Sequence, residues 1–97
     1  MVVYLYRWKI KSGCEDDFRI GWAAITEYHR THSNSLGSRL HHGGDGLFYG
    51  YACWPNSEVR EQAFAKQVDI PERQLMVDSI EESFPSVEMS VVEDLLS

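Results

Sequence analysis

Histidines and tryptophans are prominent among the residues of this 97-residue chain whose side chains could take part in a reaction. Trp22 and His29 are seven residues apart, so they share one face if this segment is helical. An imidazole titrates near neutral pH and can accept a proton from a phenol or a quinol. His29 is therefore a candidate general base. The alternative, in which His29 is only a hydrogen-bonded histidine of the core, is left open by the sequence.

The four histidines do not predict a metal site. His29 and His32 precede a loop, and His41 and His42 follow it. Adjacent residues of a strand point to opposite faces, so His41 and His42 cannot both turn toward one ion. No cysteine or carboxylate completes a recognised ligand spacing. We predict no bound metal, and His32 is explained by the last turn of a helix, where positive charge is favourable.

The composition indicates one soluble domain over residues 1–97. The chain has 15 acidic and 9 basic residues, and its net charge of -6 repels phosphate groups. Nucleic acid and anionic membranes are therefore excluded as partners. Cys14 and Cys53 match no paired spacing and are expected to be reduced thiols, and the apolar run at the start is too short to span a membrane. We expect a cytoplasmic protein.

A hairpin is the clearest element that could position these residues. Its strands are expected over Leu36–His42 and Leu47–Trp54, and the glycine-rich segment 43–46 supplies the positive φ angles of a tight turn. The second strand is apolar on both of its faces, so both faces should be covered.

A strand and a long helix precede the hairpin. Val2–Ile10 alternates, with a wholly apolar face and a face that becomes charged toward its end. Ser12 and Glu15 have the spacing of a capping box, which predicts a helix from about Cys14 to about Thr31, with Asn34 as a left-handed cap after it. Its buried face would consist of Phe18, Trp22, Ile25, His29 and His32.

Two helices and a strand are expected after the hairpin. Asn56 or Ser57 can cap a helix that ends near Gln67. A third helix should start near Pro71, direct Leu75, Met76, Ser79 and Ile80 inward, and end near Phe84-Pro85. Alternation from Val87 to Val91 predicts a last strand. This order is typical of the α+β ferredoxin-like plan, βαββαβ, with a four-stranded antiparallel sheet and all helices on one face.

Helices on one face leave the other face of the sheet bare. Leu47, Tyr49 and Tyr51 would then contribute to an exposed apolar patch of a kind that monomers seldom have. We therefore predict a homodimer that forms through the open sheet face.

Three stretches resemble the antibiotic biosynthesis monooxygenase domain, a family of dimeric α/β barrels: WKIKSGCEDDF, GWAAITEYHRTH and SLGSRLHHGGDGLFYGYACWPNSE. The likeness is clearest in the Lys-x-Gly turn before the first helix and in Tyr-Ala-x-Trp at the end of the hairpin. The family includes cofactor-independent oxygenases of aromatic quinols, haem-degrading enzymes and quinol monooxygenases.

The resemblance implies a pocket between the sheet and the helices that takes a small aromatic molecule. It implies no cofactor, because a deprotonated, electron-rich ring can pass an electron to oxygen directly. Trp22 and Trp54 are as well explained by a plain core as by a pocket wall. The residues placed at the pocket are His29, as the catalytic base, and Tyr6, Trp8, Trp22, Gly50 and Trp54, as substrate-binding residues.

The sequence departs from the family at several positions. The aromatic oxygenases have an asparagine four residues before the tryptophan that matches Trp54, and here that residue is Gly50. The haem-degrading members use an asparagine, a tryptophan and a histidine, and the corresponding places here are Tyr6, Phe64 and the neighbourhood of Gln74. The resemblance therefore argues against haem degradation.

Two functions follow from these residues. The first is a cofactor-independent monooxygenase that acts on a small aromatic quinol or anthrone-type substrate. The second is a non-catalytic domain of the same fold that binds a small molecule or a partner, and Gly50 favours it because the amide is missing.

Overall fold

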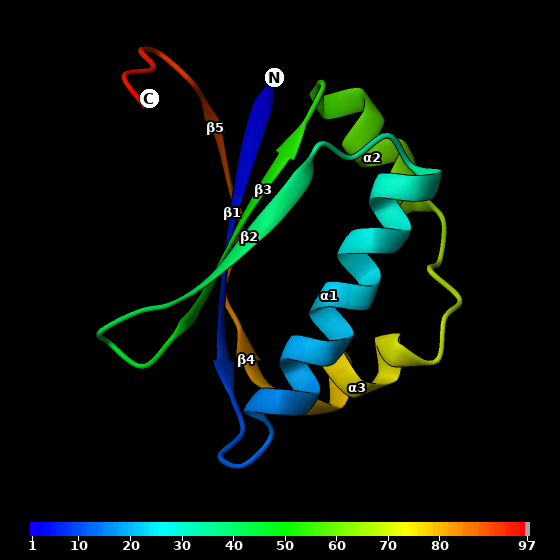
Figure 1. Cartoon of the computed structure of the whole chain (residues 1–97), viewed down its shortest axis with the longest axis vertical. Coiled ribbons are helices and arrows are strands. Elements are labelled where there is room, and N and C mark those ends of the chain that lie inside the picture. Colours follow the sequence, from blue (N-terminus) through cyan, green and yellow to red (C-terminus); the bar gives the residue numbers. More distant parts are fainter. Residues whose placement is uncertain (97) are drawn as a thin grey trace.

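The alternating segment Val2–Ile10 forms β1, the central strand of one antiparallel sheet (Figure 1). The computed structural model describes residues 1–96; Ser97, the last residue of the expected domain, lies outside them. β1 pairs on one side with β3 (Phe48–Trp54), which pairs in turn with β2 (Gly37–His42). On its other side β1 pairs with two short strands, β4 (Ile80–Ser83) and β5 (Val87–Ser90).

The helices of the described chain all cover one face of this sheet, as Figure 1 shows with the strands on the left and the helices on the right. They are α1 (Glu15–His32), α2 (Ser57–Ala65) and α3 (Glu72–Ser79). The predicted α+β ferredoxin-like architecture is confirmed, and its fourth strand position is shared by β4 and β5. None of these helices is long and apolar enough to cross a membrane.

The end of the third helix differs from the prediction. α3 stops at Ser79, and Ile80–Ser83 forms β4, which the sequence analysis placed in the helix. Ile80 pairs with Ile10 of β1, and the Lys9 ammonium lies 2.8 Å from a Glu81 carboxylate oxygen. The free edge of β1 supplies hydrogen-bond partners that outweigh the weak helical pattern of this segment.

The inward face of α3 is also narrower than predicted. Ser79 is buried and donates a hydrogen bond of 2.6 Å to the carbonyl oxygen of Leu75, and Met76 is half-buried. The Leu75 side chain, which was expected to point inward, is 38% exposed. A helix of two turns buries only a narrow stripe.

Two of the predicted helix signals are confirmed and one is wrong. Asn56 caps α2, because its side-chain oxygen accepts a hydrogen bond of 2.9 Å from the Val59 N–H. Asn34 has φ 60°, the left-handed conformation expected after α1. The capping box is not formed, because the N-cap of α1 is Cys14 and no side chain caps it.

The turn of the hairpin needs one left-handed glycine. Only Gly46 has a positive φ, 84°, in the segment 43–46. Its N–H donates to the Gly43 carbonyl oxygen at 3.0 Å, and the Leu47 N–H donates to the Asp45 carboxylate at 3.0 Å. The side chain therefore takes over part of the turn's hydrogen bonding.

A group of aromatic rings joins α1 to the sheet. Phe18 of α1 is fully buried, with its ring edge-to-face against Trp8 at 5.2 Å and against Phe48 at 5.4 Å between centroids. Trp8 and Phe48 come from neighbouring strands and point to the same face. Rings in this geometry contribute about 0.5–1.5 kcal/mol beyond the area that they bury.

Gly21 allows α1 and α3 to pack with their backbones in close contact. A Cβ at this position would lie 2.6 Å from the Met76 nitrogen and 2.7 Å from the Glu72 carbonyl oxygen. These atoms belong to a helix backbone and cannot turn away.

We therefore expect Gly21→Ala to push the two helices apart and to lower the free energy of unfolding by about 1–3 kcal/mol. Urea denaturation followed by circular dichroism measures this. Gly44→Ala is the matched control, because a Cβ at Gly44 meets nothing within 4 Å, and its effect should stay within about 0.5 kcal/mol. Equal stabilities of the two variants would contradict the close packing.

Candidate functional site

A cavity of about 680 Å³ lies between the sheet and the helices. Its walls come from the strands β1, β2 and β3, from the three helices α1, α2 and α3, and from the connection between α2 and α3. This volume is within the range of small-molecule sites. The structure brings together at this one cavity all six residues singled out from the sequence, which are Tyr6, Trp8, Trp22, His29, Gly50 and Trp54.

His29 lies on the α1 side of the cavity and is only 7% exposed. Its ring stacks on Phe64 with centroids 5.6 Å apart and meets the edge of Trp54 at 5.5 Å. Its Nδ1 atom lies 3.2 Å from the hydroxyl oxygen of Ser33, one turn further along the helix. Burial lowers the pKa of His29 below its usual 6.5, so the imidazole is neutral at pH 7.

Trp54 closes β3 and is 2% exposed. Its indole N–H is buried and has no hydrogen-bond partner within residues 1–96. A buried indole nitrogen normally finds an acceptor, and leaving it unpaired costs about 1–3 kcal/mol. Trp54 therefore supplies an unused donor at the wall of the cavity.

The space that Gly50 leaves is filled by protein. A Cβ at Gly50 would lie 2.8 Å from the six-membered ring of Trp8, so no larger residue fits here without moving that ring. The indole nitrogen of Trp22 lies 3.7 Å from the same Cβ position. The Trp8 ring therefore occupies the position that a side chain at residue 50 would take, and Gly50 and Trp8 both line the cavity.

Arg60, which the sequence analysis missed, does not line the cavity but holds two of the residues that do, Tyr6 and Phe64. Its guanidinium lies between the rings of Phe64, at 4.1 Å, and Tyr4, at 4.2 Å from the centroids. It donates to the Tyr6 hydroxyl oxygen through Nε at 3.2 Å and through a terminal nitrogen at 3.0 Å. Both acceptor positions of this oxygen are then filled, so the Tyr6 hydroxyl can act toward a further group only as a donor.

The pKa of Tyr6 agrees with a hydroxyl that acts as a hydrogen-bond donor. Burial raises the pKa of the Tyr6 phenol above 10.0, and the hydrogen bonds and positive charge of Arg60 offset part of the rise. Tyr6 therefore keeps its proton at neutral pH. The spacing of Arg60 and Phe64, four residues apart after the Asn56 cap, is the one signal in the sequence that could have placed both on one face of α2.

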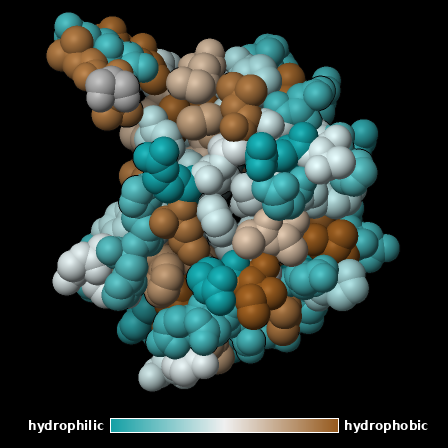
Figure 2. All heavy atoms as spheres, viewed as in Figure 1, coloured by the Kyte–Doolittle hydropathy of each residue, from teal (hydrophilic) through white to brown (hydrophobic). Residues whose placement is uncertain are grey.

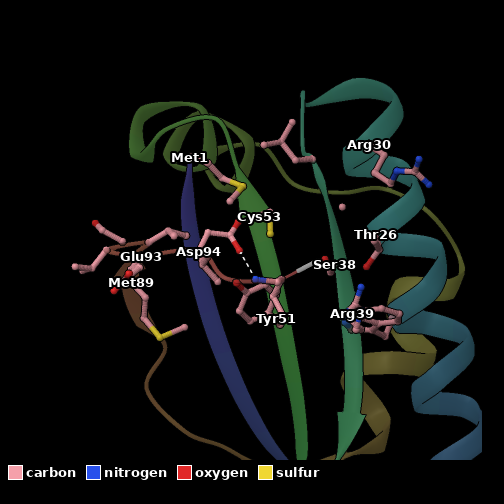
Figure 3. A pocket seen from close by; sticks show the side chains of 18 of the residues that line it. Met1, Thr26, Arg30, Ser38, Arg39, Tyr51, Cys53, Met89, Glu93 and Asp94 are labelled. Atoms are coloured by element: carbon pink, nitrogen blue, oxygen red, sulfur yellow. Dashed lines mark hydrogen bonds between the residues drawn. The ribbon is translucent and has the colours of Figure 1, made fainter.

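A second hollow, of about 1110 Å³, lies along the edge of β2 and the outer face of the sheet. Figure 3 shows Tyr51, Cys53 and Met89 at this hollow, together with Glu93 and Asp94 of the C-terminal segment. Although it is larger, its wall lacks the His29, Trp54 and Tyr6 side chains. The chemistry-bearing residues belong to the cavity under the helices.

The remaining histidines and the cysteines form no further cluster. His32, His41 and His42 are exposed, and Cys14 and Cys53 are free thiols. Within residues 1–96, no three potential ligands among histidine, cysteine, aspartate and glutamate come close enough to hold a metal ion.

No protein-family model matches this sequence, and no curated protein is significantly similar to it. Solved structures share its fold. SnoaB, a cofactor-independent oxygenase from Streptomyces nogalater, superposes with a TM-score of 0.80 at 14% identity, over 99% of this chain and 97% of SnoaB. A putative antibiotic biosynthesis monooxygenase from Bordetella bronchiseptica gives a TM-score of 0.80 at 17% identity, over 95% and 97% of the two chains.

A third structure, a putative antibiotic biosynthesis monooxygenase from Nitrosomonas europaea, has a TM-score of 0.76 at 13% identity, over 96% of this chain and all of the other. The resemblance drawn from the sequence motifs therefore agrees with the fold over nearly the whole length. At these identities the likeness concerns the fold, and the roles of His29 and its neighbours stay predictions.

The lowered pKa of His29 makes stability depend on pH. The unfolded chain binds a proton at His29 near pH 6.5, whereas the folded chain binds it only at lower pH. The free energy of unfolding should therefore decrease as the pH falls through 6.5 and level off below the folded pKa. His29→Gln should remove this part of the pH dependence. Urea denaturation between pH 5 and pH 8 measures it.

The exposed His41 provides the control for this series. His41→Gln should keep the wild-type pH dependence, because this ring lies on the exposed hairpin. A ring titration by NMR that placed the His29 pKa at or above 6.5 would contradict the effect of burial.

Proposed function

We propose that this protein is a monooxygenase that needs no cofactor and acts on a small aromatic quinol or anthrone-type substrate in the cavity under the helices. The observation that supports this most directly is a neutral histidine on the wall of an aromatic cavity. Burial keeps the His29 imidazole unprotonated, and Trp22, Trp54 and Phe64 give a flat ring apolar surfaces to pack against. The fold shared with a cofactor-independent oxygenase adds to this support.

His29 would begin the reaction as a general base. In the tautomer that donates from Nδ1 to the Ser33 hydroxyl, Nε2 holds a free lone pair. This atom would take a proton from the substrate, and the resulting anion would give one electron to O₂. In an anthrone-type substrate the two radicals join and water leaves, so that a ring CH₂ group and O₂ become a C=O group and water. In a quinol the same steps convert the quinol and O₂ into a hydroxyquinone and water. The atoms and electrons then balance without a further reductant.

Two indole N–H groups could stabilise the oxygen anion that forms. The Trp54 N–H is buried without a partner, and the Trp22 nitrogen lies 3.7 Å from the Cβ position of Gly50. Donors fixed in a water-poor site stabilise developing negative charge. Trp22 thus offers a donor near the position where the family's asparagine side chain would begin.

The second candidate is a binding domain without catalysis. Its support is Gly50 itself, because the space above it holds the Trp8 ring and no amide. The two candidate functions differ in one measurable property: the monooxygenase converts its ligand to product, whereas the binding domain does not.

Oxygen uptake with hydroquinones and anthrones, measured on metal-free protein, tests the first proposal. We expect uptake above the buffer rate, with an acid limb below pH 6.5 set by His29. His29→Gln should lower the rate by about 10²–10⁴-fold, the usual contribution of a general base.

His32→Gln is the matched control, since His32 is exposed one turn further along α1, and it should retain the wild-type rate. An equal rate in both variants would remove His29 from the mechanism. A wild-type rate equal to that of buffer, with a ligand still bound, would leave the binding domain as the function.

We further propose that two copies associate through the outer face of the sheet. Leu5 and Tyr51, both half-buried, point to this face, which no helix of the described chain covers (Figure 1). Val87 at the edge of the same face is 47% exposed. The C-terminal segment adds Val92, Leu95 and Leu96, at 96%, 85% and 89% exposed. Figure 2 shows this end as a protrusion with hydrophobic atoms on its surface.

Light scattering after size exclusion should return twice the 11.2 kDa of one chain. Tyr51→Glu should weaken the association at least tenfold, because it places an unpaired carboxylate in the buried interface. Ile20→Glu on the helical side, where Ile20 is 42% exposed, should leave the mass unchanged. An 11 kDa wild-type species at micromolar concentration would refute the dimer.

A further inference from the structure

The charged groups on the wall of the inner cavity are all of one sign. The chain has 15 acidic and 9 basic residues, yet no aspartate or glutamate lines this cavity among the residues described. Lys66 and Arg73 do line it, together with the neutral His29. Asp69 and Glu72 belong to the same part of the chain but are not part of the wall.

The two cations lie at the outer part of the cavity. Lys66 is exposed and follows directly after α2, and Arg73 is half-buried near the start of α3. They flank the connection between the two helices, which forms the outermost loop on the right of Figure 1. His29 and Trp54, by contrast, are more than nine-tenths buried. The cavity is therefore aromatic at its inner end and positive where it opens.

Neither cation is neutralised by the protein. The ion pairs within residues 1–96 are Lys9 with Glu81, Arg19 with Asp16 and Arg30 with Glu27. An arginine beside an apolar wall can bind a carboxylate through two parallel hydrogen bonds, and these are stronger than bonds between neutral groups.

The second hollow, on the outer face of the sheet, has charged residues of both signs on its wall, in contrast to the inner cavity. It is larger, and its wall contains Glu27, Glu93 and Asp94 as well as Arg30 and Arg39. Acidic and basic groups offset each other there. Only the inner cavity combines buried aromatic rings with cations alone.

We infer that the ligand of the inner cavity is an aromatic acid, whose carboxylate is held by Arg73 and Lys66 while its ring lies against Trp22, Trp54 and Phe64. This inference rests on the proposed function for the use of the cavity, and it narrows the substrate class to acids. Arg73 and Lys66 act in binding and specificity and take no part in proton transfer.

The test compares two compounds of the same shape and different charge. 6-Hydroxy-2-naphthoate and 6-hydroxy-2-naphthamide differ only in the acid group, and calorimetry measures their binding without any turnover. Wild-type protein at low salt should bind the acid at least tenfold more tightly than the amide. High salt should reduce that ratio, because Lys66 is exposed to solvent.

Arg73→Gln combined with Lys66→Gln should bring the two affinities to within about twofold of each other and leave that of the amide unchanged. Arg19→Gln is the control, since Arg19 is an exposed arginine of α1 whose charge faces Asp16, and it should keep the wild-type ratio. If the double variant does not fold, the wild-type protein provides the test: the ratio of acid affinity to amide affinity should decrease at high salt, and a ratio that does not change would overturn the inference.

Equal affinities of the acid and the amide in the wild type would overturn the inference, as would a ratio that the double variant retains. Binding of neither compound at millimolar concentration would overturn it too. Failure of the oxygen-uptake assay is a separate result, because a preference for the acid requires no reaction. A charge preference without oxygen uptake would therefore sustain this inference and refute the monooxygenase.

Discussion

The contact between Trp8 and Gly50 determines the shape of the site. Trp8 reaches from β1 over β3, and it can do so only because Gly50 has no side chain. The same ring packs on Phe18 at 5.2 Å and stacks on Tyr6 at 5.7 Å. Phe18 holds α1 on the sheet, while Tyr6 leads through its hydroxyl to Arg60 and α2. The close approach of one indole to one glycine thus connects the floor of the cavity with two of its walls.

The two-residue period of the strands keeps the inner and outer faces of the sheet chemically distinct. On β1, Tyr4, Tyr6 and Trp8 form a row of stacked rings toward the helices. Val3 and Leu5 point the other way, toward the face that no helix of the described chain covers. Each face can therefore serve a different purpose, with a ligand site beneath the helices and an association surface behind. A one-residue shift in register would exchange the two sets of residues.

The sequence predicted the long elements and the inner row of rings because their patterns are local. β1 and α1 repeat their apolar residues over many positions, so their ends were within one residue of those observed. β4 was missed because its four residues have no alternation and become a strand only by pairing with the edge of β1. Arg60 was missed for a related reason, since its partner Tyr6 is 54 residues away and only folding brings them together.

β4 and β5 share one position at the edge of the sheet, and this affects how readily strands of other protein molecules can pair with that edge. Each of these strands has four residues, and Pro85 lies in the interval between them. An unbroken outer strand offers a continuous row of amide and carbonyl groups on which foreign strands can stack. Here that row is interrupted in the middle by a residue that has no N–H to donate. This border of the sheet is therefore a poor template for fibril growth.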